Sequence, residues 1–243
     1  MSVLDGPRRE IRRILDGGTP QWVSPSDDGS ELVLMDGRRV PESTVTYLPP
    51  CDPSKILCIH LNYDSRRVEF RAPALTTPTY FQKPTTALNS HRGVLYRPAD
   101  CQLMNYEGEV AAVVGRPMRN VSREDVWDHL AGFAPSNDVG LHDFRETDAG
   151  SMLRVKGQDG NCPIGPGLVS GVDIRESTLR TFATRRRSWN SCPDFATPGL
   201  CALSCRALPA SSARRCRRRP TGMRRRRTRR RCGRVDSGSR GYG

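Results

Sequence analysis

Short apolar runs recur along the first 182 residues, and turn-forming residues separate them. The clearest runs cover residues 31–35, 45–48, 55–61 and 110–115. Apolar runs of four to eight residues bounded by Gly, Pro or Asp are typical of β-strands. Asp36 and Gly37 follow the first run directly and indicate a hairpin turn. The pattern therefore predicts a chain that is mainly β.

Helical signals are few. Ser122 precedes three polar residues and then Val126, Trp127 and Leu130, which predicts a capped helix ending near Gly132. Residues 8–16 fit either a short helix or an edge strand, and residues 153–157 and 167–170 resemble short strands. The chain contains no strand–helix repeat and no Gly-rich phosphate loop. The fold class expected is therefore mainly β with some α.

Three segments follow from this pattern. Residues 1–50 look like a small β-rich N-terminal module, and a proline-containing linker separates them from residues 55–182. Residues 183–243 form an arginine-rich tail. Residues 1–184 contain 21 Lys and Arg against 24 Asp and Glu, whereas residues 185–243 contain 18 Arg, no Lys and 2 Asp. The net charge of +13 therefore comes from the tail alone.

The cysteines and the apolar content bear on the compartment. The nine cysteines include no CxxC pair, and their spacing matches no zinc-ligand pattern. No apolar run approaches the ~18–20 residues needed to cross a membrane, and the N-terminus does not resemble a signal peptide. The expected location is the cytoplasm, with reduced thiols and no membrane partner.

Two glutamates open the apolar run at residues 110–115. Side chains alternate along a strand, so Glu107 and Glu109 point the same way. Gly108 between them suits a bend or a close approach. Two carboxylates on one face repel each other unless a cation lies between them, and a hard divalent ion is a natural choice. A solvated edge strand is the alternative for this pair alone.

Five motifs, taken together, resemble the fumarylacetoacetate hydrolase superfamily. They occur in the family's order at residues 55–63, 81–84, 106–115, 137–143 and 156–166. The resemblance implies a mixed β-sandwich roll and a catalytic domain over residues 55–182. It also implies an enzyme that acts on enolisable 2-oxo acids, with a homodimer in full-length relatives.

The resemblance also implies roles for individual residues. It places a Mg²⁺ or Mn²⁺ ion on Glu107, Glu109 and Asp138, where it would stabilise the enolate of the substrate. Lys156 would add a second positive charge near the enolate oxygen. Lys83 would contact either the substrate or a structural carboxylate. Asp143 would brace its loop, and His142, where the family often carries Arg, receives no catalytic role.

One departure from the family pattern bears on the reaction. Hydrolases of the superfamily often pair a His with a Glu to activate water; here Glu69 is kept, but Arg66 occupies the His position. Arginine stays protonated and does not act as a base at neutral pH. Arg66 or Arg67 could instead bind the distal carboxylate of a dicarboxylic substrate, or both could be solvated. This departure favours the isomerase/decarboxylase branch of aromatic-compound catabolism, with C–C bond hydrolysis as the alternative.

The tail suggests two further hypotheses. Arginine runs without lysine are typical of GC-rich DNA translated out of frame, so a frameshift near residue 183 would explain the loss of family pattern. The fold would then be incomplete at its C-terminus, and the chain could be inactive. Such runs also neutralise phosphates, which predicts nonspecific, salt-dependent binding of nucleic acid. They equally suit a disordered, solvated segment.

Overall fold

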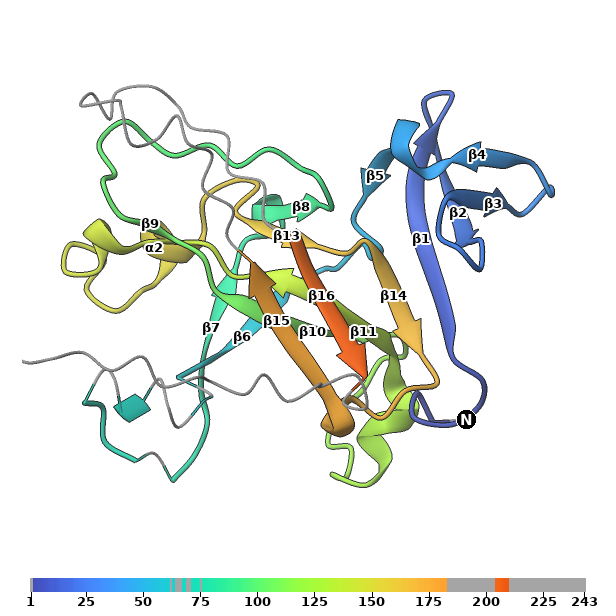
Figure 1. Ribbon diagram of the computed structural model, residues 1–243. Coiled ribbons are helices and arrows are strands. Elements are labelled where there is room, and N and C mark those ends of the chain that lie inside the picture. The colour runs from blue at the N-terminus through green and yellow to red at the C-terminus, as the bar shows by residue number, and fades with distance from the viewer. Residues whose placement is uncertain are drawn as a thin grey trace, which may run out of the picture. The chain divides into compact units, whose positions relative to one another are not determined.

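The computed structural model describes residues 2–61, 63, 67–68, 71–74, 76–182 and 204–209. Strands make up most of the regular secondary structure of these residues, so the prediction of a mainly β chain is confirmed (Figure 1). The N-terminal strands are β1 (Arg9–Asp16), β2 (Thr19–Pro25), β3 (Glu31–Leu34), β4 (Arg39–Pro41) and β5 (Thr46–Leu48). The next strands are β6 (Ile56–His60), β7 (Thr79–Lys83), β8 (Leu88–Ser90), β9 (Met104–Asn105) and β10 (Gly108–Val114). The last are β11 (Leu130–Asn137), β12 (Gly140–Leu141), β13 (Cys162–Ile164), β14 (Gly167–Ser170), β15 (Ser177–Phe182) and β16 (Ser204–Pro209).

Helices are short. The α-helix α2 covers Leu153–Lys156. The 3-10 helices are η1 (Glu42–Thr44), η2 (Thr85–Ala87), η3 (Asp125–His129), η4 (His142–Phe144) and η5 (Ile174–Glu176).

A ten-stranded sheet joins the N-terminal strands to the rest of the chain. Its main path runs β4-β3-β2-β1-β14-β11-β13-β8, with β10 beside β11 and β5 beside β1. The junction is the antiparallel pairing of β1 with β14, in which Arg9 lies opposite Ser170 and Arg12 opposite Gly167. The strands of residues 1–50 therefore share backbone hydrogen bonds with a strand more than 100 residues further along the chain.

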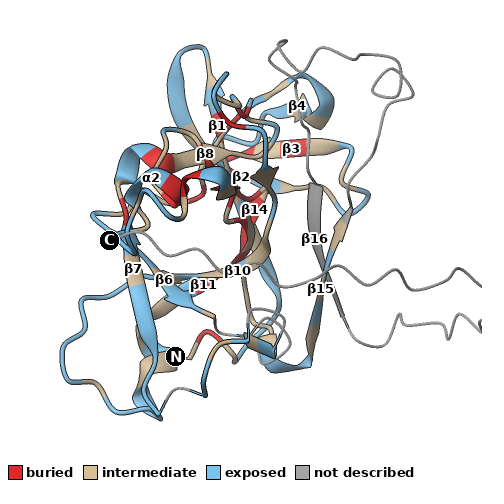
Figure 2. Ribbon diagram, turned by 90° about the vertical axis from the view of Figure 1, so that its left-hand side faces the viewer, coloured by how far each residue is buried: buried red, intermediate tan, exposed pale blue. Residues whose placement is uncertain are grey.

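Separate apolar clusters stabilise the two ends of this sheet. The N-terminal cluster contains Ile14, Val23, Leu32, Leu34 and Tyr47. A second cluster forms around Ala134, Ile164 and Leu168, against which Ala111 and Val113 of β10 pack. Buried residues are also prominent in α2 (Figure 2).

Strand β10 is partly buried, and on one face only. Val110 is 36% exposed and Val114 52% exposed, because they alternate with the core-facing Ala111 and Val113. This outer face borders a cavity of about 800 Å³, and the described residues that line it include no Lys, Asp, Glu or His. Strand β15 contacts β10, and β16 contacts β11 (Figure 1).

Two predicted elements differ in the structure. The expected helix from Ser122 to Gly132 is only the 3-10 helix η3, because strand β11 begins at Leu130 and pairs with β10 along its length. The expected strand at residues 153–157 is helix α2. There, Asp148 accepts a hydrogen bond of 3.0 Å from the backbone N–H of Val155, which stabilises the turn.

Candidate active site

Two of the three lysines in the sequence are among the most buried side chains in the described residues. Lys83 is 0% exposed and Lys156 is 2% exposed, whereas Lys55 is exposed. Burying an ammonium group costs a large hydration free energy unless carboxylates or other acceptors contact it. The partners of these two lysines therefore locate a site with unusual chemistry.

Strand register brings the carboxylates to the lysines. Gly108 pairs with Asn137 at the ends of β10 and β11, so the residues just outside the pair, Glu107 and Asp138, lie side by side. The backbone N–H of Asp138 donates to the Glu107 carbonyl at 2.8 Å. The Asn137 side chain accepts a hydrogen bond of 2.9 Å from the Glu107 N–H. These hydrogen bonds fix the backbone of Glu107 and Asp138, and so bring the two carboxylates close together.

Lys156, at the end of α2, lies between the two carboxylates. Its Nζ is 2.9 Å from Glu107 Oε2 and 3.0 Å from Asp138 Oδ2. It also donates to the Asp138 carbonyl at 2.7 Å. Lys83, the last residue of β7, contacts the other oxygen of Asp138, Oδ1. One carboxylate is therefore shared by two buried ammonium groups.

The opposite side of Glu107 faces a histidine. His142 Nε2 lies 3.2 Å from Glu107 Oε1, and Arg145 Nη2 lies 3.4 Å from the same nitrogen. Burial raises the pKa of Glu107, but the His142 hydrogen bond and the Lys156 charge outweigh burial and hold it at about 2. Glu107 is therefore ionised at neutral pH. The family motif implied no catalytic role for His142; its position four residues after Asp138 in that motif was the available signal.

Two thiols, Cys58 and Cys162, have raised pKa values that favour the neutral form. Burial raises the pKa of Cys162, and burial together with the Asp138 charge raises that of Cys58 to about 12. Burial would lower the pKa of Lys83, but the charge and hydrogen bond of the Asp138 carboxylate raise it above its ordinary value. The site thus combines ammonium and carboxylate groups with neutral thiols.

Gly140 has no side chain, which lets the His142 and Lys156 side chains pack against its backbone. A Cβ on Gly140 would lie 2.9 Å from His142 Cδ2 and 3.2 Å from Lys156 Cε. Gly140 pairs with Asn105 between β12 and β9, which places it close to Glu107. A similar limit applies to Gly108, whose Cβ would lie 1.9 Å from Thr181 Oγ1 of β15, so the expected close approach at Gly108 is found.

The other predicted site residues lie in different surroundings. Glu109 of β10 lies opposite Ser136 of β11. Burial and, to a smaller extent, the Glu109 charge raise the pKa of Tyr63. Arg67 Nη1 donates to the Ala72 carbonyl at 3.2 Å. Asp143 accepts a 2.9 Å hydrogen bond from the Leu103 N–H and so holds a loop. Arg66 and Glu69 lie outside the described residues.

The donor set suits a hard cation only in part. Glu107 and Asp138 supply carboxylate oxygens, the ligand type of such ions, but the Lys156 ammonium lies between Glu107 Oε2 and Asp138 Oδ2. Within the described residues no group of three or more His, Cys, Asp or Glu is arranged to hold a metal ion, so the ligand set of Glu107, Glu109 and Asp138 stays a prediction.

The comparisons with known proteins identify the family. The model of the fumarylacetoacetate (FAA) hydrolase C-terminal family matches residues 55–196, more than half of the chain. The chain therefore belongs to the FAA hydrolase family. The match extends past residue 183, so the frameshift proposed there stays a prediction.

Curated relatives in this family carry more than one activity in their names. The 4-hydroxyphenylacetate degradation bifunctional isomerase/decarboxylase of Salmonella dublin is 30% identical over 70% of this chain and 38% of its own length. The mitochondrial oxaloacetate tautomerase fahd2 of Xenopus laevis is 32% identical over 53% of this chain and 41% of its own. The chain spans 60%, 56% and 51% of the length of three further curated relatives.

Solved structures agree with the fold. The 5-carboxymethyl-2-hydroxymuconate delta-isomerase of Mycobacterium smegmatis superposes with a TM-score of 0.63 and 30% identity, over 72% of each chain. The curled, mostly β architecture is thus the FAA hydrolase-like fold expected from the motifs. In the described part of the chain, no helix is long and apolar enough to cross a membrane.

Proposed function

We propose that this chain is an isomerase or decarboxylase that acts on an enolisable 2-oxo dicarboxylic acid, in the breakdown of aromatic compounds. The named isomerase/decarboxylase and tautomerase relatives support this class of reaction. The observation that carries the proposal is Lys156, an ammonium group that is 2% exposed and held between two carboxylates. A buried, fixed positive charge is what an enolate oxygen requires.

Enol formation, double-bond isomerisation and decarboxylation all pass through an enolate. Loss of a proton from the carbon next to the 2-oxo group leaves its electron pair in an enolate, with negative charge on the oxygen. Returning the proton to oxygen gives the enol, and returning it to a different carbon of a diene moves the double bond. In decarboxylation the bond to a carboxylate breaks instead, CO₂ leaves, and its electron pair forms the enolate of the shortened product, which then takes up a proton. Lys156 stabilises that charge in each case.

The other residues take supporting roles in the proposal. Glu107, Asp138 and Glu109 would hold Mg²⁺ or Mn²⁺, which when bound supplies Lewis-acid stabilisation of the developing charge. Arg66 and Arg67 would bind the distal carboxylate, and Glu69 would move a proton. Lys83 contacts Asp138, which favours the structural role over direct substrate contact.

The test is turnover of oxaloacetate, a simple enolisable 2-oxo dicarboxylate, with Mn²⁺ in excess. Enol formation is followed by ultraviolet absorbance and CO₂ release by a coupled assay. Lys156→Met should lower kcat on the order of 100-fold, since it removes an oxyanion-stabilising group. Lys55→Met, a substitution of the exposed lysine, is the matched control and should match the wild type.

Other outcomes separate the alternatives. If the wild-type protein cleaves an acylpyruvate but does not turn over oxaloacetate, the C–C bond hydrolase is favoured. Equal rates in the wild type, in Lys156→Met and in buffer would mean that the proposed activity is wrong for this chain.

A further inference from the structure

The turn at residues 158–161 connects the segments that follow the two buried lysines. The turn begins two residues after Lys156, and the Gly160 N–H donates a hydrogen bond of 3.0 Å to the Thr86 carbonyl. Thr86 itself lies three residues after Lys83. A shift of this turn would therefore move the two lysine-bearing segments relative to each other.

The same turn is hydrogen-bonded to the segment that carries Asp138. The Val139 N–H donates to the Asn161 carbonyl at 3.2 Å, which continues the antiparallel pairing of β11 with β13. The Asp138 carboxylate contacts both Lys83 and Lys156. The three segments whose charges meet at Asp138 are therefore all joined by this turn.

Asn89 of β8 holds the turn through its side-chain amide. Its Nδ2 donates to the Gly160 carbonyl at 2.9 Å and to the Val94 carbonyl at 3.0 Å. Its Oδ1 accepts a hydrogen bond of 2.8 Å from the Ser90 N–H. These partners use both amide hydrogens and fix the orientation of the amide, because only its nitrogen can donate. A Cβ on Gly93 would lie 1.9 Å from Asn89 Oδ1, so packing also encloses this side chain.

We propose that Asn89 is a positioning residue, which fixes the turn at residues 158–161 and so keeps Lys156 aligned with the enolate. The proposal rests on the proposed function, in which Lys156 stabilises that enolate. Asn89 acts through the backbone of Gly160, four residues after Lys156. A displacement of about 1 Å in a catalytic group can lower a rate on the order of 100-fold, so the position of this turn affects the reaction.

The first experiment removes the two donors and measures turnover of oxaloacetate by the full chain. Asn89→Asp keeps the shape of the side chain but has no hydrogen to donate to the two carbonyls, and Asn89→Leu removes the donors without adding a charge. Each should lower kcat on the order of 10-fold and leave KM unchanged, because Lys156 acts on the transition state. Asn120→Asp makes the same chemical change at an exposed position and should match the wild type.

A double substitution separates this proposal from the proposed function. In a Lys156→Met background, Asn89→Leu should lower kcat no further, because the group that Asn89 positions is gone. The same fold-loss in both backgrounds would overturn the positioning role. Unchanged kcat in both Asn89 variants, with Lys156→Met impaired, would overturn the positioning role and leave the proposed function intact. Wild-type kcat in Lys156→Met would overturn both.

A measurement without substrate tests the link between Asn89 and Lys156 directly. Reductive methylation labels lysine amines, and mass spectrometry separates the peptides of the three lysines. Lys156 is 2% exposed, so its labelling requires local opening, whereas the exposed Lys55 serves as the internal reference. Asn89→Leu should raise the labelling rate of Lys156 relative to Lys55 about 10-fold, since two hydrogen bonds that oppose opening are lost. Asn120→Asp should leave this ratio as in the wild type. An unchanged ratio in Asn89→Leu would overturn the proposal.

Discussion

Single residues decide how closely the charged groups of the site approach one another. Lys83 and Lys156 share Asp138, while Glu107 lies between Lys156 and His142. The contacts of His142 and Lys156 depend on Gly140, because a Cβ there would meet both side chains. Substitutions that change a contact by a few tenths of an ångström should therefore affect chemistry before they affect folding.

Gly140→Ala tests this sensitivity. The added Cβ would lie 2.9 Å from the His142 ring and 3.2 Å from the Lys156 side chain, so both must shift. We expect kcat/KM on oxaloacetate to fall on the order of 10-fold, because misplaced catalytic groups are costly. Thermal unfolding serves as the control and should change little. Wild-type kcat/KM would show that the close packing at Gly140 is unimportant for the reaction.

The low pKa of Glu107 predicts a pH dependence of stability. Burial raises this pKa, but His142 and Lys156 lower it to about 2 from 4.5. A carboxyl whose pKa is lower in the folded state stabilises that state above its unfolded pKa, and this stabilisation is lost as pH falls from about 4.5 to about 2. At most about 3 kcal/mol is involved.

The measurement compares urea unfolding of the metal-free wild type and Glu107→Gln between pH 6 and pH 2. The free energy of unfolding of the wild type should fall more steeply below pH 4.5, since glutamine does not titrate. Parallel curves for the two proteins would contradict a lowered pKa.

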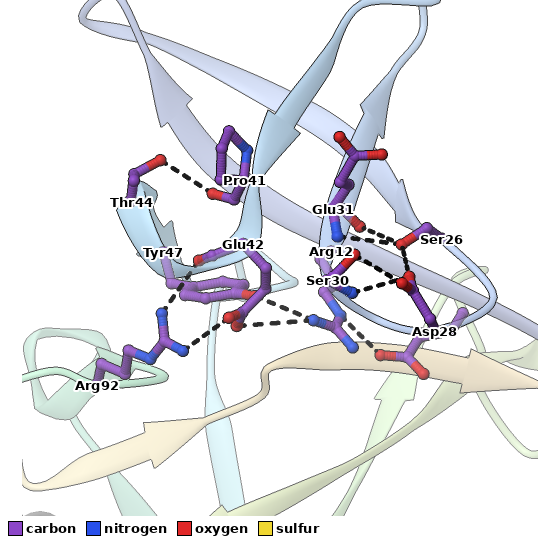
Figure 3. A network of polar contacts seen from close by, with 11 residues as sticks. Arg12, Ser26, Asp28, Ser30, Glu31, Pro41, Glu42, Thr44, Tyr47 and Arg92 are labelled. Carbon is purple, nitrogen blue, oxygen red and sulfur yellow. Dashed lines mark hydrogen bonds and ion pairs between the residues drawn. The ribbon is translucent and has the colours of Figure 1, made fainter.

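Among the elements, η1 and the segment after β8 are joined by a polar network (Figure 3). Glu42 of η1 accepts hydrogen bonds of 2.8 Å from Tyr47 Oη and from Arg92 Nη2. Arg12 of β1 donates to Tyr47 Oη at 3.0 Å. The ring of His91 packs edge-on against Tyr47, with centroids 4.9 Å apart. This network, together with the β1–β14 pairing, connects the N-terminal strands to the remainder of the sheet.

Removing the shared acceptor should destabilise the fold. Glu42→Ala leaves Tyr47 Oη and Arg92 without their carboxylate, at an expected cost of about 1–3 kcal/mol. Arg38→Ala is the control: Arg38 is 57% exposed and pairs with Asp16 and Asp36, so its loss should cost no more than about 1 kcal/mol. Chemical denaturation measures both. A Glu42→Ala protein as stable as Arg38→Ala would show that the network contributes little.

The elements also show where local sequence is informative. The Asp36-Gly37 turn and the apolar alternation beyond Gly108 are local signals, and β3 and β10 were predicted from them. The length of β11 was not predicted, because Leu130 also suits a helix. Only its pairing with β10 selects the strand. Helix α2 depends on Asp148, a contact from outside the segment. Strand β16 lies in a segment predicted to be a disordered tail and was not expected.

For the whole molecule, the uneven charge leads to a prediction about polyanions. Residues 185–243 carry 18 Arg against 2 Asp, and the arginine runs lie outside the described residues. We expect the full chain to bind duplex DNA without sequence preference, with an affinity that falls steeply as salt rises, because binding releases counterions.

Fluorescence anisotropy with two unrelated duplexes over a salt series makes this measurement. The two duplexes should give the same binding curve, and binding should weaken sharply between about 50 and 200 mM salt. Selective binding of one duplex at physiological salt would instead indicate a nucleic-acid-binding function.

The sequence by itself determined the mainly β class, the family motifs and the identity of the charged residues, because strand alternation, turn residues and motif order are local properties. Only the tertiary structure decided which of those charges meet. The Gly108–Asn137 register places Glu107 beside Asp138, and α2 brings Lys156 between them. The described residues contain no group of three or more His, Cys, Asp or Glu arranged to hold a metal ion, so the role of Glu109, two residues after Glu107, stays a prediction. His142 became a candidate only through its contact with Glu107, since a contact across 35 residues is set by packing.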